Sequence, residues 1–202
     1  ASMVPMNVDG ISCVLVLTLR GLLAARVDAG HEGESLAQFP WVTSLANSIA
    51  SPAVFGDSVV LTSGYSQSRT ARVRITAEGA EPVWETPNVY SKICTPIIHD
   101  GRVYFAWQKL RCLAWETGEV VWEGGRFGDG ASLILTADER LIVFGAKTLT
   151  LCATGETYTE LTTRSGVGSA QAWPHVALSD GRVLCRDREG SLGCFALGEG
   201  MP

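Results

Sequence analysis

The chain has 202 residues, a formal net charge of −5 and a sequence pI near 5.2. With 46% hydrophobic and 18% charged residues it can build a buried core, which excludes wholesale disorder. An acidic chain offers no basic face that would neutralise phosphates, so we expect no nucleic-acid partner. The 22 glycines, together with frequent Val, Leu and Thr, favour turns and strands over helices, and we predict an all-β protein.

The most apolar segment, residues 11–25, lies near the start of the chain. A membrane-spanning helix needs about 20 apolar residues, and Arg20 and Gly21 interrupt this segment. A signal peptide begins with basic residues, whereas the charged residue before this segment is Asp9. We therefore interpret the segment as two adjacent buried strands that turn near Arg20, and we expect neither a membrane span nor a signal peptide in this chain.

One pattern recurs five times: an apolar run, a turn with Asp or Gly, and a second apolar run. The turn aspartates, 38 to 48 residues apart, are Asp9, Asp57, Asp100, Asp138 and Asp180. A second turn follows each first turn in nearly the same phase, and its glycines are Gly30, Gly79, Gly118, Gly155 and Gly198. Two turns in register at a period of about 40 residues are typical of β-propeller blades. A β-sandwich, the competing all-β fold, does not predict this period.

The repeat predicts a single partial β-propeller domain of about five four-stranded antiparallel blades. The approximate blades are residues 1–47, 48–90, 91–128, 129–168 and 169–202, and the last is incomplete. A large side chain follows the second turn in two repeats, Trp84 in the second and Trp122 in the third. The candidates for this place in the other repeats are Phe39 or Trp41 in the first and Tyr158 or Leu161 in the fourth.

The third repeat carries a resemblance to a known family. Its residues 114–122, Ala-Trp-Glu-Thr-Gly-Glu-Val-Val-Trp, resemble the tryptophan-docking repeat of quinoprotein-like, or PQQ-like, β-propellers. The matching residues are Ala114, Glu116, Gly118 and Trp122, and the second repeat matches through Trp84 with one extra residue after its glycine. Residues 51–197 resemble bacterial PQQ-like repeat proteins along almost their whole length. The resemblance implies a blade-docking role for these residues and a periplasmic or extracellular location.

The function that the resemblance implies depends on the branch of the family. Quinone-dependent alcohol dehydrogenases hold PQQ and calcium on the propeller axis, and use a ring between adjacent cysteines together with acidic residues. Here the closest cysteines, Cys185 and Cys194, are nine residues apart, and no acidic cluster suggests a calcium cage. We therefore expect no cofactor and no metal, and a non-catalytic scaffold that binds proteins or ligands, as in the lipoprotein scaffold of outer-membrane assembly.

Two alternatives stay open: a fragment of a quinone-dependent dehydrogenase whose active-site residues lie outside this chain, and a small closed propeller that binds sugars. Because the family commonly closes with seven or eight blades, we expect an open arc, the C-terminal part of a longer propeller. An open arc exposes the faces of its first and last blades. The expected partners are therefore other proteins, missing blades of the same protein, or a second copy of the chain.

Few residues are candidates for chemistry. The sequence has no GxSxG or HExxH motif, and we predict no catalytic residue. His175 follows Trp173 and Pro174 at the start of the expected innermost strand of the last repeat, so Trp173 and His175 are candidate contacts for a ligand in the central channel. A packed or solvated structural role is the alternative. Asp187 and Glu189 flank Arg188 at an expected charged hairpin tip.

Two further patterns predict which side chains are buried. Arg72 and Arg74 alternate with apolar residues, which predicts a strand with one solvent-facing side. Cys112, Cys152 and Cys194 recur 40 and 42 residues apart, so we expect them to be small buried residues at one repeated strand position.

Overall fold

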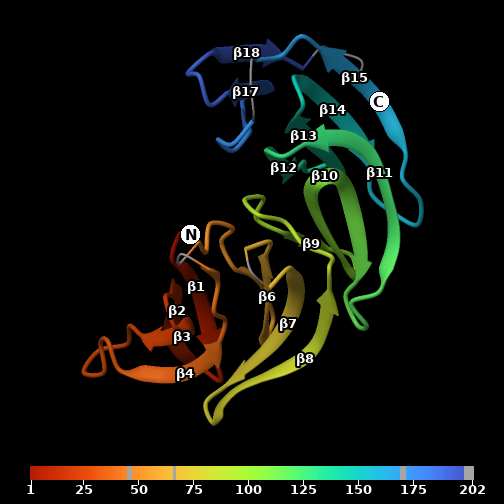
Figure 1. The fold of residues 1–202 in the computed structure, drawn as a ribbon. Helices are drawn as coiled ribbons and strands as arrows, with labels where there is room; N and C mark the ends of the chain where they lie inside the picture. The colour runs from red at the N-terminus through yellow and green to blue at the C-terminus, as the bar shows by residue number, and fades with distance from the viewer. Residues whose placement is uncertain (45–46, 66, 169–171, 198–202) are drawn as a thin grey trace. The chain divides into compact units, whose positions relative to one another are not determined.

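The computed structural model describes residues 1–44, 47–65, 67–168 and 172–197. Within these ranges the chain forms 18 β-strands and no α-helix, so the all-β prediction is confirmed. No helix in this part of the chain is long and apolar enough to cross a membrane. The strands form five antiparallel sheets, each built from strands that are consecutive in sequence, and we call these sheets blades 1 to 5 (Figure 1).

Three blades have four strands in simple sequence order. Blade 1 holds β1 (Val4–Val8), β2 (Ile11–Thr18), β3 (Gly21–Arg26) and β4 (Ser35–Pro40). Blade 2 holds β5 (Ala53–Phe55), β6 (Ser58–Ser63), β7 (Arg69–Thr76) and β8 (Gly79–Pro87). Blade 4 holds β12 (Ala131–Leu135), β13 (Arg140–Gly145), β14 (Thr148–Ala153) and β15 (Glu160–Ser165).

The other two sheets carry three strand labels each, but blade 3 has the expected four strand segments because β10 folds back on itself as a hairpin. Blade 3 holds β9 (Ile97–His99), β10 (Arg102–Ala114) and β11 (Val120–Gly128). β10 reverses direction at the exposed Gln108, with φ 62°, and Lys109, so that Trp115 N just after its end donates to the Gly101 carbonyl just before its start at 3.0 Å. Blade 5 holds β16 (Ala177–Ser179), β17 (Arg182–Arg186) and β18 (Leu192–Ala196). A fourth strand there would fall on residues 198–202, outside the described part.

The predicted turns have the backbone conformation that their residue types favour. Asp9, Asp100 and Asp180 have φ values of 43–50°, in the left-handed region that Asp tolerates. In the other two turns Gly56 or Glu139 takes this conformation instead. The second-turn glycines of the first four repeats all have positive φ, and Gly198 lies outside the described residues. Residues 11–25 form β2 and β3, which pair in antiparallel register around the turn at Arg20.

The chain divides into two compact units, which we describe separately. The first comprises Ala1–Gly101 with Ala114–Glu119, and the second comprises Arg102–Leu113 with Val120–Pro202. In the first unit the apolar faces of blades 1 and 2 form a core that includes Leu15, Leu22, Leu61, Val73 and Ile75. In the second unit a core joins blades 4 and 5 through residues that include Ile142, Phe144, Val183 and Cys185. A blade cannot bury both faces alone, so these stacked faces supply the hydrophobic stabilisation.

Candidate functional site

The tryptophan of blade 2 docks on the second turn of the next repeat, residues 114–119. The buried Trp84 indole on β8 donates its Nε1–H to the Trp115 carbonyl at 2.8 Å, and Thr86 donates to the Gly118 carbonyl at 2.7 Å. Gly118 has φ 73°, and its backbone lies against the Trp84 indole. A Cβ at this position would stand only 2.5 Å from the Trp84 ring, so the contact requires glycine. Ala114 closes this turn by accepting a hydrogen bond from Gly118 N at 2.9 Å.

The tryptophan of blade 3 makes the same kind of contact with blade 4. Trp122 on β11 is buried and donates its Nε1–H to the Gly155 carbonyl at 2.8 Å. Its ring lies between Tyr104 and Tyr158, with ring centroids 5.9 Å and 5.8 Å away. The Tyr104 hydroxyl accepts a hydrogen bond from Gly155 N at 3.2 Å, so the acceptor loop is fixed from both sides.

A β-bulge sets the position of each docking tryptophan on its strand. Trp84 pairs with Arg72, and the preceding Val83 is the extra residue of the bulge. Trp122 pairs with Cys112, and there the extra residue is Val121. Because the bulge recurs at the same step, it identifies the equivalent position in the other blades.

The same bulge in blades 1 and 4 assigns the equivalent residues. In blade 1 the extra residue is Leu36 and the equivalent of tryptophan is Ala37. In blade 4 the extra residue is Leu161 and the equivalent is Thr162. The predictions for this place, Phe39 or Trp41 and Tyr158 or Leu161, were therefore wrong. They failed because the links that precede β4 and β15 differ in length, so counting from the glycine loses the strand register.

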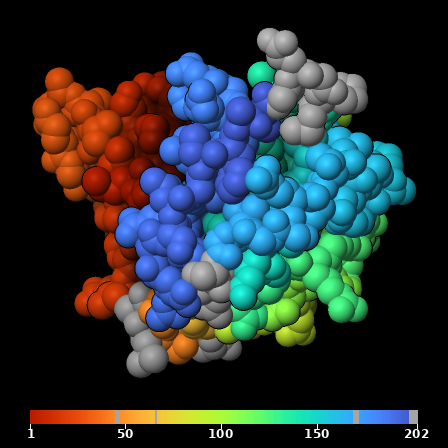
Figure 2. Space-filling model, turned by 90° about the horizontal axis from the view of Figure 1, so that it is seen from above, coloured from red at the N-terminus to blue at the C-terminus, as the bar shows by residue number. Residues whose placement is uncertain are grey.

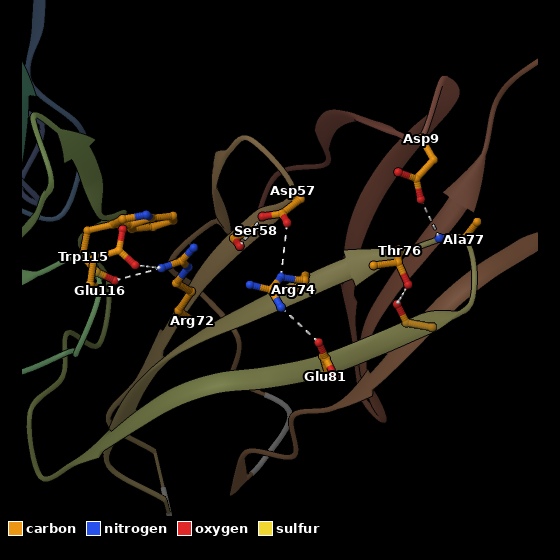
Figure 3. A network of polar contacts seen from close by, with 11 residues as sticks. Asp9, Asp57, Ser58, Arg72, Arg74, Thr76, Ala77, Glu81, Trp115 and Glu116 are labelled. Atoms are coloured by element: carbon orange, nitrogen blue, oxygen red, sulfur yellow. Dashed lines mark hydrogen bonds and ion pairs between the residues drawn. The ribbon is translucent and has the colours of Figure 1, made fainter.

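Arg72 belongs to the same blade contact, which corrects the expected solvent-facing side of β7. Its side chain is only 7% exposed, and its guanidinium lies 4.0 Å from the centroid of the Trp115 ring (Figure 3). Nη1 of Arg72 donates to the Trp115 carbonyl at 3.2 Å and to the exposed Glu116 carboxylate at 3.1 Å. Arg74, two residues further along β7, is half-exposed and forms ion pairs with Asp57 and Glu81, as expected for a solvent-facing side. The side of β7 that carries Arg72 is shielded from solvent because the indole of Trp115 covers the guanidinium.

Trp173 and His175 lie in the loop before β16 rather than at the start of that strand, and both side chains are exposed. The guanidinium of Arg188 lies 4.5 Å from the centroid of the Trp173 ring. The protein atoms around His175 exclude enough water to lower the pKa of its imidazole below the ordinary value. The structure thus places Arg188, which the sequence assigned only to a hairpin tip, beside Trp173.

Ser132 of blade 4 fixes the backbone of this loop. The buried Ser132 hydroxyl donates to the Pro174 carbonyl at 3.3 Å and accepts from Val176 N at 2.9 Å. A serine on the preceding blade gives no sequence signal for this role. The loop that carries Trp173 is therefore held in place while the indole itself stays accessible.

The hairpin beside Arg188 is organised by a buried carboxylate, which corrects the expected exposed pair of acids. Asp187 is buried and accepts a hydrogen bond from Ser191 N at 2.8 Å, so its carboxylate fixes the β17–β18 turn. Glu189 is exposed as expected. Among the residues that the structure describes, no group of three or more His, Cys, Asp or Glu side chains is placed to hold a metal ion.

Five of the six cysteines are buried, and the exception is Cys194. Burial raises the pKa of the Cys112, Cys152 and Cys185 thiols to about 11. Cys112 and Cys152 lie on strands covered by β11 and β15, whereas Cys194 lies on β18, which pairs only with β17 among the described strands. The prediction of one repeated buried position is thus correct for two cysteines and wrong for the third.

We expect Ellman's reagent at pH 8 to modify one thiol of the native protein rapidly and the other five only after unfolding. The reagent needs an accessible thiolate, which the buried, proton-retaining thiols do not supply. A Cys194→Ser variant should lose the rapid phase. Two or more rapid thiols in the folded protein would contradict the described burial. Because burial raises the pKa of the Cys112, Cys152 and Cys185 thiols from 9.0 to about 11, their contribution to stability is lost as the pH rises through this range.

No protein-family profile and no curated protein matches the chain. Several solved structures, in contrast, superimpose on the chain. BamB from Moraxella catarrhalis superimposes with a TM-score of 0.68 at 15% identity, over 95% of this chain and 60% of BamB. The computationally designed Ika8 protein gives a TM-score of 0.69 at 11% identity, over 97% of this chain and 58% of Ika8. The fold is a β-propeller.

A third similar structure differs in size. The computationally designed Ika4 protein has a TM-score of 0.64 at 13% identity, and the match covers 82% of this chain and 99% of Ika4. The chain therefore spans about 60% of the length of BamB and Ika8 but exceeds Ika4. At these identities the likeness establishes the propeller fold alone.

Proposed function

We propose that the chain is a non-catalytic propeller that acts as a scaffold and binds a partner protein through blade 5. The observation that carries the proposal is the exposed Trp173. Its side chain is 39% exposed, whereas the other five tryptophans are at most 9% exposed. Tryptophan and arginine are the residue types that most often dominate the energetics of protein interfaces, and Arg188 stacks on this indole.

The surroundings of Trp173 define the chemistry of the partner. Blade 5 carries exposed Arg182 and Arg186 on β17, and exposed Asp180 and Glu189 at its two hairpin turns, so its charge is mixed around Arg188. A partner that fits this surface offers an apolar or aromatic side chain to Trp173 and carboxylates to the arginines. Because Ser132 already fixes the loop, binding costs little additional ordering of the backbone. The resemblance to the non-catalytic branch of the PQQ-like repeat proteins supports the same proposal.

Photo-crosslinking in the native cells tests this proposal. We expect p-benzoylphenylalanine in place of His175, two residues from Trp173, to yield an adduct with a defined protein. The same group in place of Val27, which is exposed on blade 1, serves as the matched control and should not yield that adduct. Adding Trp173→Ala should remove the adduct from the first position. Equal adducts at both positions, or an adduct that persists without Trp173, would overturn the proposal.

A further inference from the structure

Blades 4 and 5 meet without a docking tryptophan. Thr162 takes the place that Trp84 and Trp122 occupy on the preceding blades, because the same bulge fixes its register. Leu197 takes the place of Trp115 on the receiving blade. The two residues are equivalent because Trp115 N donates to the Gly101 carbonyl at 3.0 Å and Leu197 N donates to the Gly181 carbonyl at 2.7 Å. The strand register at this contact therefore matches that of the contacts made by Trp84 and Trp122, but the indole is missing.

A cavity of about 200 Å³ lies at this place, between β14–β15 and β17–β18. Thr162 and Leu197 both line it, so the cavity corresponds to the space that an indole fills in the contact between blades 2 and 3. Blade 5 and β15 lie directly beside each other in Figure 2, in blue and light blue. The cavity thus lies where Thr162 and Leu197 stand in place of two tryptophans.

The lining of the cavity is apolar with one cationic group. Leu149 and Leu151 line it from blade 4, and the buried Val183 lines it from blade 5. Arg164, on the exposed strand β15, also lines it, and its guanidinium lies 4.6 Å from the centroid of the Phe195 ring. A guanidinium that contacts an aromatic ring can still donate its N–H groups to a carboxylate, which guanidinium groups bind in a bidentate manner.

We propose that this cavity binds a small aromatic carboxylate, with the ring in the tryptophan position and the carboxylate on Arg164. The equivalent sites accept an indole, which sets the size and shape of the ring. Apolar walls with one oriented charged group are the usual composition of a small-molecule site. The ligand class follows from the cavity alone and does not depend on the partner proposed for Trp173.

Titration of the full chain with indole-3-acetate, followed by ¹H–¹⁵N NMR, tests this site. A ligand of this size should bind with a Kd of about 0.1–1 mM and shift resonances of β14, β15 and residues 195–197. Thr162→Trp should weaken binding at least about tenfold because the new indole fills the cavity. No shifts at millimolar ligand, shifts confined to other blades, or unchanged binding to the folded Thr162→Trp variant would each overturn the proposal.

The role of Arg164 has its own test, which does not depend on the folding of the tryptophan variant. Arg164→Gln should weaken indole-3-acetate about tenfold and leave neutral 3-methylindole unchanged, since only the carboxylate loses its partner. Arg126→Gln, at an exposed arginine on β11 outside the cavity lining, is the charge-matched control and should alter neither ligand. Equal effects of the two substitutions would show that general charge, not this site, attracts the anion.

Discussion

Replacing Trp122 by alanine is expected to lower the free energy of unfolding by about 3–5 kcal/mol. The substitution removes a buried indole from between Tyr104 and Tyr158 and leaves a cavity between blades 3 and 4. It also leaves the Gly155 carbonyl without the donor that now reaches it at 2.8 Å. The lost hydrogen bond and the lost apolar burial both destabilise the folded protein, since the contact between the two blades supplies hydrophobic stabilisation. Urea unfolding followed by circular dichroism measures the difference.

Two further variants separate the contributions at this site. Trp122→Phe keeps an aromatic ring but loses the N–H donor, so we expect an intermediate loss. Trp173→Ala removes an exposed indole and should cost less than about 1 kcal/mol, since little packing is lost. If Trp122→Ala were no more destabilising than Trp173→Ala, the docking role of Trp122 would be wrong.

Gly118→Ala is expected to destabilise the protein by about 3 kcal/mol or more, although it adds only one methyl group. Part of the cost arises because φ at Gly118 is 73°, which costs an L-residue about 1–2 kcal/mol. The larger part is steric, because the new Cβ would lie 2.5 Å from the Trp84 ring and 2.8 Å from the Thr86 hydroxyl. The indole must then move away from the carbonyl that it binds.

Gly30→Ala is the matched control for the backbone part of this effect. Gly30 is the equivalent second-turn glycine of blade 1, with φ 84°, but its added Cβ meets no atom within 4 Å. We expect this variant to lose only about 1–2 kcal/mol. Thermal or urea unfolding of both variants isolates the clash with Trp84. Equal losses in the two variants would mean that the indole does not rest on Gly118.

The repeat made the fold predictable from the sequence, because Asp and Gly mark turns through their backbone preferences. Each of the five sheets lies within one of the five predicted intervals. The position of the turn between the second and third strand segments of blade 3 was not predictable, because Gln108 and Lys109 form this turn without an Asp or a Gly to mark it. The docking positions of blades 1 and 4 were also missed. Their register depends on a β-bulge between two paired strands, and counting residues along one strand does not reveal that bulge.

Side-chain environments were predicted less well where a neighbouring blade decides them. The alternation of arginine and apolar residues on β7 predicted a solvent-facing side chain for Arg72. Trp115, 43 residues later in the chain, instead covers its guanidinium. Cys194 matches the spacing of two buried cysteines, yet no fourth strand covers it in the described part of blade 5. Trp173 and His175 were identified from their place at the start of an expected innermost strand. Arg188, which stacks on Trp173, and Ser132, which holds the backbone of Pro174 and Val176, belong to segments that local sequence does not connect to this loop.

The affinity of the protein captured by crosslinking next to Trp173 is the most direct test of the proposed scaffold function. Calorimetric titration should give a Kd for the wild-type chain that Trp173→Ala weakens about 30-fold or more, as expected of an interface hot spot. Val27→Ala, on exposed blade 1 surface, should leave that Kd unchanged. An affinity that is the same for Trp173→Ala and wild type would contradict the assignment of blade 5 as the partner-binding surface.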